Sequence, residues 1–282
     1  MEGRGAAHLR RMLNAVATTG LLVAAMRAEE SARPDRLFAD PFAAELAGDA
    51  GRAALAAYRA ATALSLPIIE VRTRFFDEAF ARAWAAGIRQ FVLLAAGMDA
   101  RAYRLPWPAG TRVFEVDQPE VLAAKAERLA QARPQCERVA VATDLAGDWP
   151  HALLAAGFDR SQRSLWLVEG LLQYLDAQVV AALFARVEGL SAPGSRLLYD
   201  VVGRALLESP GLAPTLRMMH ELGAPWRFAT DEPARLIGEH GWDAVVTNPA
   251  ALAAEWGRWP FPTLPPDATG APRGHMVEAS KP

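Results

Sequence analysis

Two apolar runs near the middle of the chain end in a glycine and in a carboxylate, and their spacing restricts the fold. The run at 91–96 leads into Gly97, and the run at 111–116 ends at Asp117, which gives a separation of 117 − 97 = 20 residues. An acidic side chain about 20 residues beyond such a glycine accepts hydrogen bonds from ribose hydroxyls in nucleoside-binding α/β folds. The spacing therefore predicts an α/β fold that holds a ligand with an adenosine group.

The first third of the chain reads as helical. Residues from about 7 to 88 contain no strand candidate, and turn signals break them at 31–34, at Asp40-Pro41 and near Pro67. Asp40 is expected to cap a helix whose first residue is Pro41. The stretch 12–26 follows Arg10-Arg11 and imitates a secretory signal, but polar residues interrupt it and no cleavage site follows, so we interpret it as an amphipathic helix.

From residue 90 the pattern changes to short β-branched or aromatic runs that alternate with helical segments. Two of the helices are predicted at 119–132 and 176–190. This alternation predicts a doubly wound, mostly parallel α/β sheet of seven strands. The strands are expected at 90–96, 111–117, 137–143, 164–169, 195–202, 242–248 and 275–280.

These patterns suggest a division of the chain. We expect an N-terminal helical cap at 1–88 and a ligand-binding domain at 89–282. Residues from about 203 to 230 interrupt the alternation after the fifth strand. An insertion beyond the carboxyl end of a strand usually covers a binding site, so this segment is a candidate lid.

Composition narrows the possible partners. The chain has 282 residues, with 30 Lys and Arg against 32 Asp and Glu, so no basic field favours nucleic acid or a membrane surface as partner. A single cysteine, Cys136, cannot form an internal disulfide, and the five histidines lack metal-ligand spacing. We expect a cytoplasmic protein with no metal.

Polar residues follow the expected strands where ligands bind in open α/β sheets. Gly97 lets backbone N–H groups approach a ligand, and Asp117 faces the ribose. Asp144 is placed to accept from an adenine amine while Leu145 packs on the base, and Glu169 ends the fourth strand. One acidic residue could simply cap the next helix, but three at neighbouring strand ends favour a ligand.

The ligand is not expected to be a dinucleotide. The segment after Gly97 lacks the G-x-G-x-x-G pattern and reaches Pro106 too soon for a long helix. An acidic rim suits a positively charged nucleoside without phosphate, and S-adenosylmethionine is such a ligand. Its amino acid carboxylate needs a cation, which Arg72 or Arg74 supplies; we favour Arg72.

At this point four motifs resemble one known family. They are Arg-Thr-Arg-Phe-Phe-Asp at 72–77, Ala-Ala-Gly-Met-Asp-Ala-Arg-Ala-Tyr-Arg-Leu at 95–105, Phe-Glu-Val-Asp-Gln-Pro at 114–119 and Glu-Gly-Leu-Leu-Gln-Tyr-Leu at 169–175. Together they resemble the leucine carboxyl methyltransferase family. The segment at 35–42, Asp-Arg-Leu-Phe-Ala-Asp-Pro-Phe, is similar to the N-terminal signature of its actinobacterial branch of S-adenosylmethionine-dependent O-methyltransferases.

The resemblance implies a Rossmann-like class I methyltransferase sheet with an N-terminal helical cap. It also implies one departure, because Ala95 stands where the family usually has the first glycine of Gly-x-Gly. A methyl group there would crowd the methionine end of the cofactor. The resemblance further implies which residues contact the cofactor. They are an arginine of 72–74, Gly97, Asp117, Asp144, Leu145 and Glu169.

Methyl transfer requires mainly that an acceptor oxygen is held near the methyl carbon. A carboxylate acceptor is ionised at neutral pH and needs no general base, so none is assigned; Tyr174 and Glu169 are the candidates for positioning. A phenol would need a base, such as His220, His151 or a carboxylate. The candidates for acceptor contacts are Tyr174, Arg204, Arg217, Met218, His220 and Trp226.

Several functions remain open. The leading hypothesis is an O-methyltransferase for a carboxylate of a small molecule or peptide terminus in specialised metabolism. A phenol or hydroxyl O-methyltransferase is the alternative on the same fold. A non-catalytic subunit that only binds the cofactor, and an NAD-dependent reductase, are alternatives from other classes.

Overall fold

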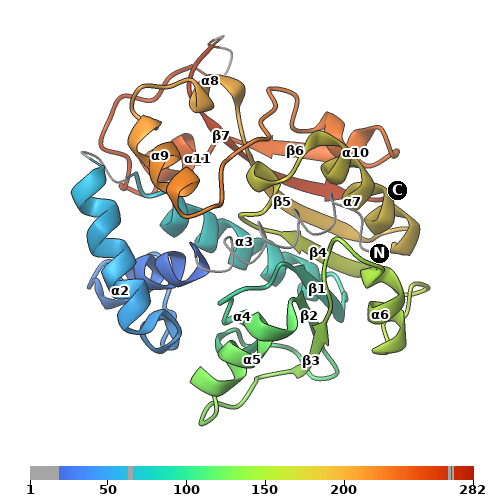
Figure 1. Cartoon of the computed structure of the whole chain (residues 1–282). Coiled ribbons are helices and arrows are strands. Elements are labelled where there is room, and N and C mark those ends of the chain that lie inside the picture. Colours follow the sequence, from blue (N-terminus) through green and yellow to red (C-terminus); the bar gives the residue numbers. More distant parts are fainter. Residues whose placement is uncertain (1–18, 63–65, 266–267, 269) are drawn as a thin grey trace, which may run out of the picture.

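A computed structural model describes residues 19–62, 66–265, 268 and 270–282. One seven-stranded sheet runs through its centre in the order β3-β2-β1-β4-β5-β7-β6 (Figure 1). Every expected strand is present within one to two residues at each end. The strands are β1 (Gln90–Leu94), β2 (Arg112–Asp117), β3 (Glu137–Ala142), β4 (Ser164–Val168), β5 (Arg196–Val202), β6 (Asp243–Thr247) and β7 (Gly274–Ser280).

The strand order places the functional edge of the sheet. The first five strands pair in parallel, whereas β7 is antiparallel to both β5 and β6. The chain reverses its direction of winding between β1 and β4, which are neighbours in space. A crevice forms at such a switch point outside the carboxyl ends of the strands. The doubly wound, mostly parallel fold is thereby confirmed.

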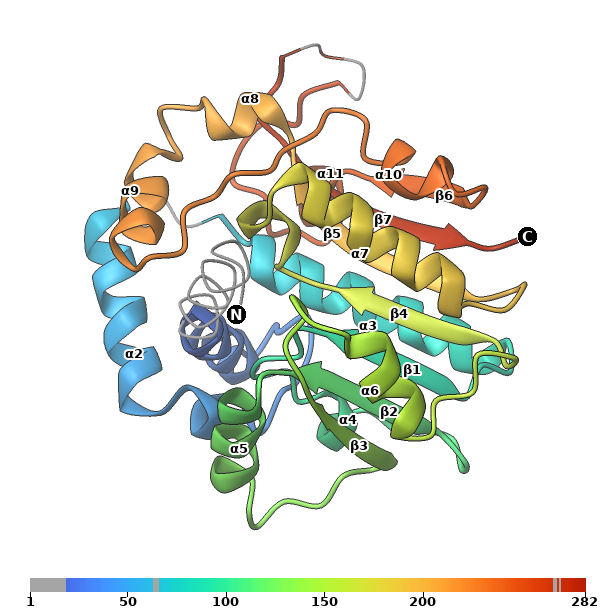
Figure 2. The ribbon, with the colours of Figure 1, turned by 45° about the vertical axis from the view of Figure 1, so that its right-hand side comes forward.

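Helices cover both faces because the central strands are apolar on both sides. In β1, Phe91 and Leu93 pack into one core cluster, whereas Val92 and Leu94 pack into the other. The two helical layers lie on opposite sides of the sheet in Figure 2. One layer contains α3 (Ile68–Ala85), α4 (Arg101–Arg104), α5 (Pro119–Arg128) and α11 (Pro249–Glu255), and the other contains α6 (Trp149–Ala155), α7 (Ala177–Leu190) and α10 (Arg235–Gly238).

The N-terminal part is helical, as expected. Residues 19–32 and α2 (Ala43–Ala61) form its first described helices, and residues 12–18 of the amphipathic helix expected at 12–26 lie outside the described part. Asp40 accepts from the backbone of Phe42, but α2 begins only at Ala43, two residues later than expected. The other carboxylate oxygen of Asp40 pairs with Arg27 and thus contributes to a buried ion pair.

The expected boundary at residue 88 does not separate two cores. Apolar side chains of α3 share one cluster with those of β1, and the ring of Phe80 stacks on that of Phe91 with centroids 5.4 Å apart. The helix before the boundary is therefore packed on the sheet. In the described residues, no helix is long and apolar enough to span a membrane.

The segment after β5 contains two helices, α8 (Arg204–Leu207) and α9 (Ala213–Glu221). Figures 1 and 2 show α9 beside α2 and α8 farther from α2, at the top of both views. The backbone N–H groups of Arg227 and Phe228 donate to the carbonyl of Gln173, in the short 3-10 helix η1 (Leu172–Tyr174). This contact holds the insertion against the segment that follows β4.

Candidate functional site

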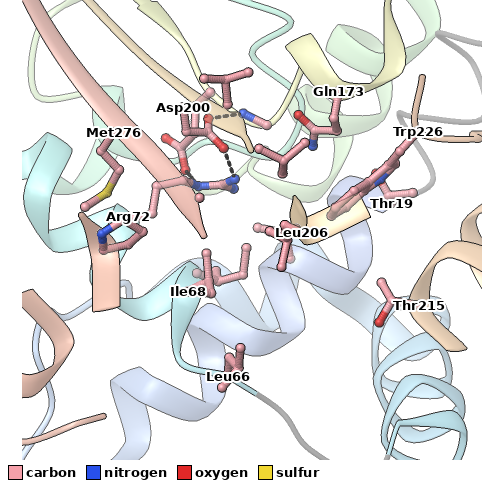
Figure 3. Close-up of a pocket in the computed structure, with 18 of the residues that line it drawn as sticks. Thr19, Leu66, Ile68, Arg72, Gln173, Asp200, Leu206, Thr215, Trp226 and Met276 are labelled. Carbon is pink, nitrogen blue, oxygen red and sulfur yellow. Dashed lines mark hydrogen bonds and ion pairs between the residues drawn. The ribbon is translucent and has the colours of Figure 1, made fainter. Parts of the chain in front are cut away.

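A cavity of about 860 Å³ opens at the carboxyl ends of the strands. This volume lies near the upper end of the range of about 300–1,000 Å³ that is usual for small-molecule sites. The strand ends form its floor, and the helix at 19–32, the start of α3, the 203–230 insertion and the segment between β6 and β7 form its walls. Figure 3 shows Arg72 and Asp200 together on one side of this space, with Leu66 and Thr215 farther away.

Gly97 and Asp117 meet in the floor, as their spacing predicts. The Gly97 N–H donates to Oδ2 of Asp117 at 2.7 Å, and the Gln118 N–H donates to Oδ1 at 2.7 Å. Burial raises the pKa of Asp117, and these two N–H groups offset part of the rise. Each carboxylate oxygen keeps lone-pair capacity for a further donor, so the geometry suits two ribose hydroxyls.

The space beside Gly97 is open. Its φ is +47°, and an added Cβ would meet no atom nearer than 3.8 Å outside its chain neighbours. Gly97 itself lines the cavity, so its backbone is open to a ligand. These residues fit the nucleoside half of S-adenosylmethionine.

Ala95 also has a left-handed backbone, with φ +54°. It is the only described residue other than glycine with positive φ. This conformation strains an L-residue because its Cβ crowds the backbone carbonyl. The position that departs from the family pattern thus keeps a conformation that glycine adopts more easily.

The expected adenine side of the site is arranged around the loop after β3. Leu145 and Thr143 line the cavity. Asp144 accepts the Ala146 N–H at 2.8 Å with Oδ1, so one of its oxygens stabilises the loop. Its assignment to the adenine amine stays a prediction.

Arg72 is the cation of the floor. Its Nε donates to Oε1 of Glu169 at 2.9 Å, and its Nη1 donates to Oδ2 of Asp200 at 2.9 Å. Figure 3 shows the guanidinium directed at Asp200. These contacts use two of the five N–H donors of an arginine side chain, so others remain for an anionic ligand.

Gly170 permits this arrangement of Arg72. A Cβ at Gly170 would lie 3.3 Å from both terminal nitrogens of the guanidinium. The residue also has φ +65°, which glycine adopts without strain. The Gly170 N–H donates to Oδ1 of Asp200 at 2.6 Å, which orients the carboxylate toward Arg72.

Arg74, the other arginine of the motif, points elsewhere. It pairs with Glu78 on the same helix at 2.8 Å, and its guanidinium lies 4.1 Å from the ring centroid of Trp256. It does not line the cavity. Of the two arginines, only Arg72 therefore lies where the sequence analysis expected the cation for the cofactor carboxylate.

A buried ion-pair network supports Glu169 from below. Arg101 donates to Oε2 of Glu169 at 2.8 Å and to Asp77 at 2.7 Å, and it also pairs with Asp99. Burial would raise the pKa of Glu169, but Arg101 and Arg72 outweigh it and the pKa is lowered. Glu169 is therefore an anion held between two cations, which suits positioning rather than proton transfer.

Tyr174 and Trp226 are the two acceptor candidates that line the cavity with their side chains close together. Their ring centroids are 6.3 Å apart in an edge-on arrangement, and the Tyr174 hydroxyl lies 4.0 Å from the sulfur of Met219.

The other four acceptor candidates do not reach the cavity. In α9, Thr215 and Met219 form the buried side, so Arg217 and His220 lie exposed on the outer side and Met218 packs against a neighbouring core cluster. Arg204 is exposed at the start of α8. The helical periodicity of this segment explains these placements.

The structure adds residues to which the sequence analysis assigned no role. Asp200 lies within β5, where it interrupts the apolar run from Leu197 to Val202 and could have been noticed as a charge in a central strand. Gln173 and His275 also line the cavity. In the described ranges, no group of three or more His, Cys, Asp or Glu side chains could hold a metal ion.

Comparison with solved structures agrees with this architecture. A DUF574-family protein from Streptomyces avermitilis superposes with a TM-score of 0.61 at 18% identity, covering 90% of this chain and 98% of that one. A methyltransferase-like protein from Thermobifida fusca has a TM-score of 0.58 at 23% identity, with 88% and 94% covered. At these identities the likeness concerns the fold.

The sheet and the arrangement at its carboxyl edge define a class I S-adenosylmethionine-dependent methyltransferase. The chain belongs to the leucine carboxyl methyltransferase family, whose model matches residues 20–188. A Frankia alni protein named as a proposed S-adenosyl-L-methionine-dependent methyltransferase is 44% identical over 86% of this chain and 89% of its own length. A similarly named Mycobacterium avium protein is 40% identical over 86% and 88%. The NAD-dependent alternative is thereby excluded.

Proposed function

We propose that this methyltransferase transfers the methyl group to a carboxylate oxygen of a small molecule. The observation that carries the proposal is the continuity of one cavity, which joins the charged floor at Arg72, Glu169 and Asp117 to a space with mainly apolar walls. In this proposal Asp117 holds the ribose and Asp144 and Leu145 hold the adenine. Arg72 then holds the amino acid carboxylate with its remaining N–H donors.

The chemistry needs no proton transfer. When bound, S-adenosylmethionine supplies a methyl group on a positively charged sulfur. A carboxylate oxygen of the acceptor forms the new bond to the methyl carbon, the sulfur–carbon bond breaks, and its electron pair stays on sulfur. The products are a methyl ester and S-adenosylhomocysteine.

An apolar cavity favours this acceptor. The negative charge of the carboxylate and the positive charge of the sulfonium are both lost as the new bond forms. Water stabilises the separated charges more than the charge-dispersed transition state, so exclusion of water lowers the barrier. In this proposal Tyr174 and Glu169 have the positioning role, with Glu169 acting through its ion pair with Arg72.

A hydroxyl acceptor is the second candidate, and His275 favours it. This side chain lines the cavity at the start of β7. Burial lowers the pKa of His275, and Arg273 lowers it further, so the imidazole is neutral near pH 7 and able to accept a proton. A phenol or alcohol could transfer its proton there as its oxygen attacks.

Product chemistry distinguishes the candidates. The protein is incubated with methyl-labelled S-adenosylmethionine and with aliphatic acids, aromatic acids and phenols, and the product is then treated with base. We expect base-labile label from the acids and full activity in His275→Gln. Base-stable label from phenols, lost in that variant, would support the hydroxyl candidate. Binding of the cofactor without any methyl release would support the non-catalytic alternative.

The proposal includes a cytoplasmic location, supported by the free thiol of Cys136. It also includes a role in specialised metabolism, which identification of the natural acceptor tests.

A further inference from the structure

The part of the cavity beyond the charged floor is lined mainly by apolar side chains, with a few polar ones such as Ser209 and Thr215 among them. We call it the outer chamber and define it by six lining residues, which are Leu66, Ile68, Leu206, Leu212, Met219 and Trp226. They come from α3 and the residues just before it, from α8, from α9 and the residue just before it, and from the segment after α9. Figure 3 shows Ile68 and Leu206 near the floor residues and Trp226 across from them. Because separate segments wall the chamber, a molecule inside it is surrounded on several sides.

Neutral polar groups occur where the outer chamber meets the floor. Gln173 is buried there, and its Oε1 has no hydrogen-bond partner among the described residues. The Tyr174 hydroxyl has only the sulfur of Met219 as its described partner. The Tyr174 hydroxyl and the Nε2 amide group of Gln173 can both donate to one carboxylate, whereas Gln173 Oε1 accepts and is left for a donor such as an ammonium or hydroxyl group of a ligand. The reacting carboxylate of an acceptor is therefore assigned to the Tyr174 hydroxyl and Gln173 Nε2.

The arginines that line the cavity already have partners. Arg72 pairs with Glu169 and Asp200, and its remaining donors are assigned to the cofactor carboxylate. Arg27 pairs with Asp40, and Arg273 donates to the carbonyls of Pro265 and Ala268. A second charged group of the acceptor, deep in the outer chamber, would face apolar side chains. Burial of an unpaired charge is strongly unfavourable. A peptide would bring a row of amide groups into the same apolar surroundings, where they would lack partners.

We infer that the acceptor is a monocarboxylic acid with an extended apolar body, which lies in the outer chamber while its carboxylate meets Tyr174 and Gln173. The inference rests on the proposed carboxyl methylation and specifies its substrate class. Burial of a methylene group contributes about 0.8 kcal/mol. Catalytic efficiency should therefore rise roughly fourfold for each added methylene until the chamber is full.

A chain-length series tests the inference. The whole protein is assayed for methyl ester formation with butanoate, hexanoate, octanoate, decanoate and dodecanoate, and with dodecanedioate and a peptide ending in leucine. We expect kcat/KM to rise along the series and to fall at least about 100-fold from dodecanoate to dodecanedioate. Calorimetry of dodecanoate with the S-adenosylhomocysteine complex gives a second readout that is independent of turnover.

The possible outcomes distinguish a failure of this inference from a failure of the proposed carboxyl methylation. Equal or better esterification of butanoate, the diacid or the peptide would overturn the apolar substrate class and leave carboxyl methylation standing. No ester from any acid, together with a base-stable product from a phenol, would overturn the proposed function itself. Failure of dodecanoate both to bind the complex and to be methylated would also overturn the inference.

A wall variant locates the apolar body. Leu206→Asp places a charge on the chamber wall and should lower kcat/KM for dodecanoate at least about tenfold, with unchanged affinity for S-adenosylhomocysteine. The matched control is Leu222→Asp in the same insertion, because Leu222 is 42% exposed and outside the cavity. An equal loss in both variants, or no loss in either, would contradict the assignment of the chamber.

Discussion

The floor and the outer chamber of one cavity are built in different ways. The floor uses residues at the ends of parallel strands, where charged groups such as Arg72 and Glu169 are fixed by ion pairs. The chamber uses apolar side chains from helices and connecting segments. Strand ends hold atoms at defined positions, which cofactor binding needs, whereas connecting segments can change without disturbing the sheet. The comparison indicates that acceptor choice can vary in this fold while cofactor binding stays constant.

The largest effect should follow from removal of the floor's cation. Arg72→Ala leaves Asp200 without its ion-pair partner and should lower the free energy of unfolding by about 3–5 kcal/mol. Affinity for S-adenosylhomocysteine should fall as well. Arg74→Ala on the same helix is the control, and its exposed pair with Glu78 should contribute no more than about 1 kcal/mol. Urea unfolding measures the stability, and calorimetry measures the affinity for S-adenosylhomocysteine. Similar losses of stability and affinity in the two variants would contradict the special role of Arg72.

Asp117→Ala tests the ribose side of the floor. Loss of a charged acceptor should cost at least about 2 kcal/mol of cofactor affinity, or about thirtyfold in the dissociation constant. Asp148→Ala is the control because Asp148 caps α6 away from the cavity. An unchanged dissociation constant in Asp117→Ala would show that the nucleoside lies elsewhere.

The stability that the ion pair of Asp99 and Arg101 contributes should depend on pH. Burial would raise the pKa of Asp99, but Arg101 and Lys125 outweigh it and lower the pKa to about 2. A carboxyl with a lowered folded pKa adds stability above its unfolded pKa of about 4, and this is lost as the pH falls toward the folded value. The stability difference between the protein and Asp99→Asn should therefore shrink by about 2 kcal/mol between pH 4 and pH 2. Unfolding by urea at several pH values measures it; a constant difference would argue against the pairing.

The smallest effect is expected at Ala95. Ala95→Gly relieves the left-handed strain but adds freedom to the unfolded chain, so we expect a net gain of about 0.5–1 kcal/mol in stability and slightly tighter cofactor binding. The control is Ala96→Gly, because the φ of Ala96 is not positive. This variant should lose about 0.5–1 kcal/mol of stability. A loss of stability in Ala95→Gly would mean that the alanine methyl makes contacts that outweigh the strain.

The sequence predicts the floor better than the chamber for a physical reason. Strands and their ends are set by local apolar runs, so the residue pattern alone is enough to assign Gly97, Asp117 and Glu169 to strand ends, and all three line the cavity. Asp200 shows in the sequence only as a charge within an apolar strand, and its pairing with Arg72 could not be predicted because it depends on how β5 lies beside β4 and opposite α3. The ion-pair network of Arg101 likewise depends on contacts between distant segments.

The walls depend on how connecting segments fold. In the 203–230 insertion, Arg204 and Arg217 are candidates for acceptor contacts by their charge and His220 as a possible base, but apolar burial turns them outward and brings Leu206 and Met219 to the cavity. The segment between β6 and β7 also contributes a wall that no motif indicates, including Phe261. Such loops carry no spacing rule, so only their three-dimensional arrangement reveals them. Whether the insertion opens and closes as a lid stays a prediction.

Gly170 offers a way to separate the position of a charge from its presence. A single methyl group at this residue would press on the Arg72 guanidinium from 3.3 Å away and would strain a backbone with φ +65°, while every ionic group of the site keeps its chemical identity. Enzymologists usually probe such a cation by deleting it, which confounds geometry with electrostatics. In this protein, a graded steric displacement of the cation is accessible through a neighbouring backbone position.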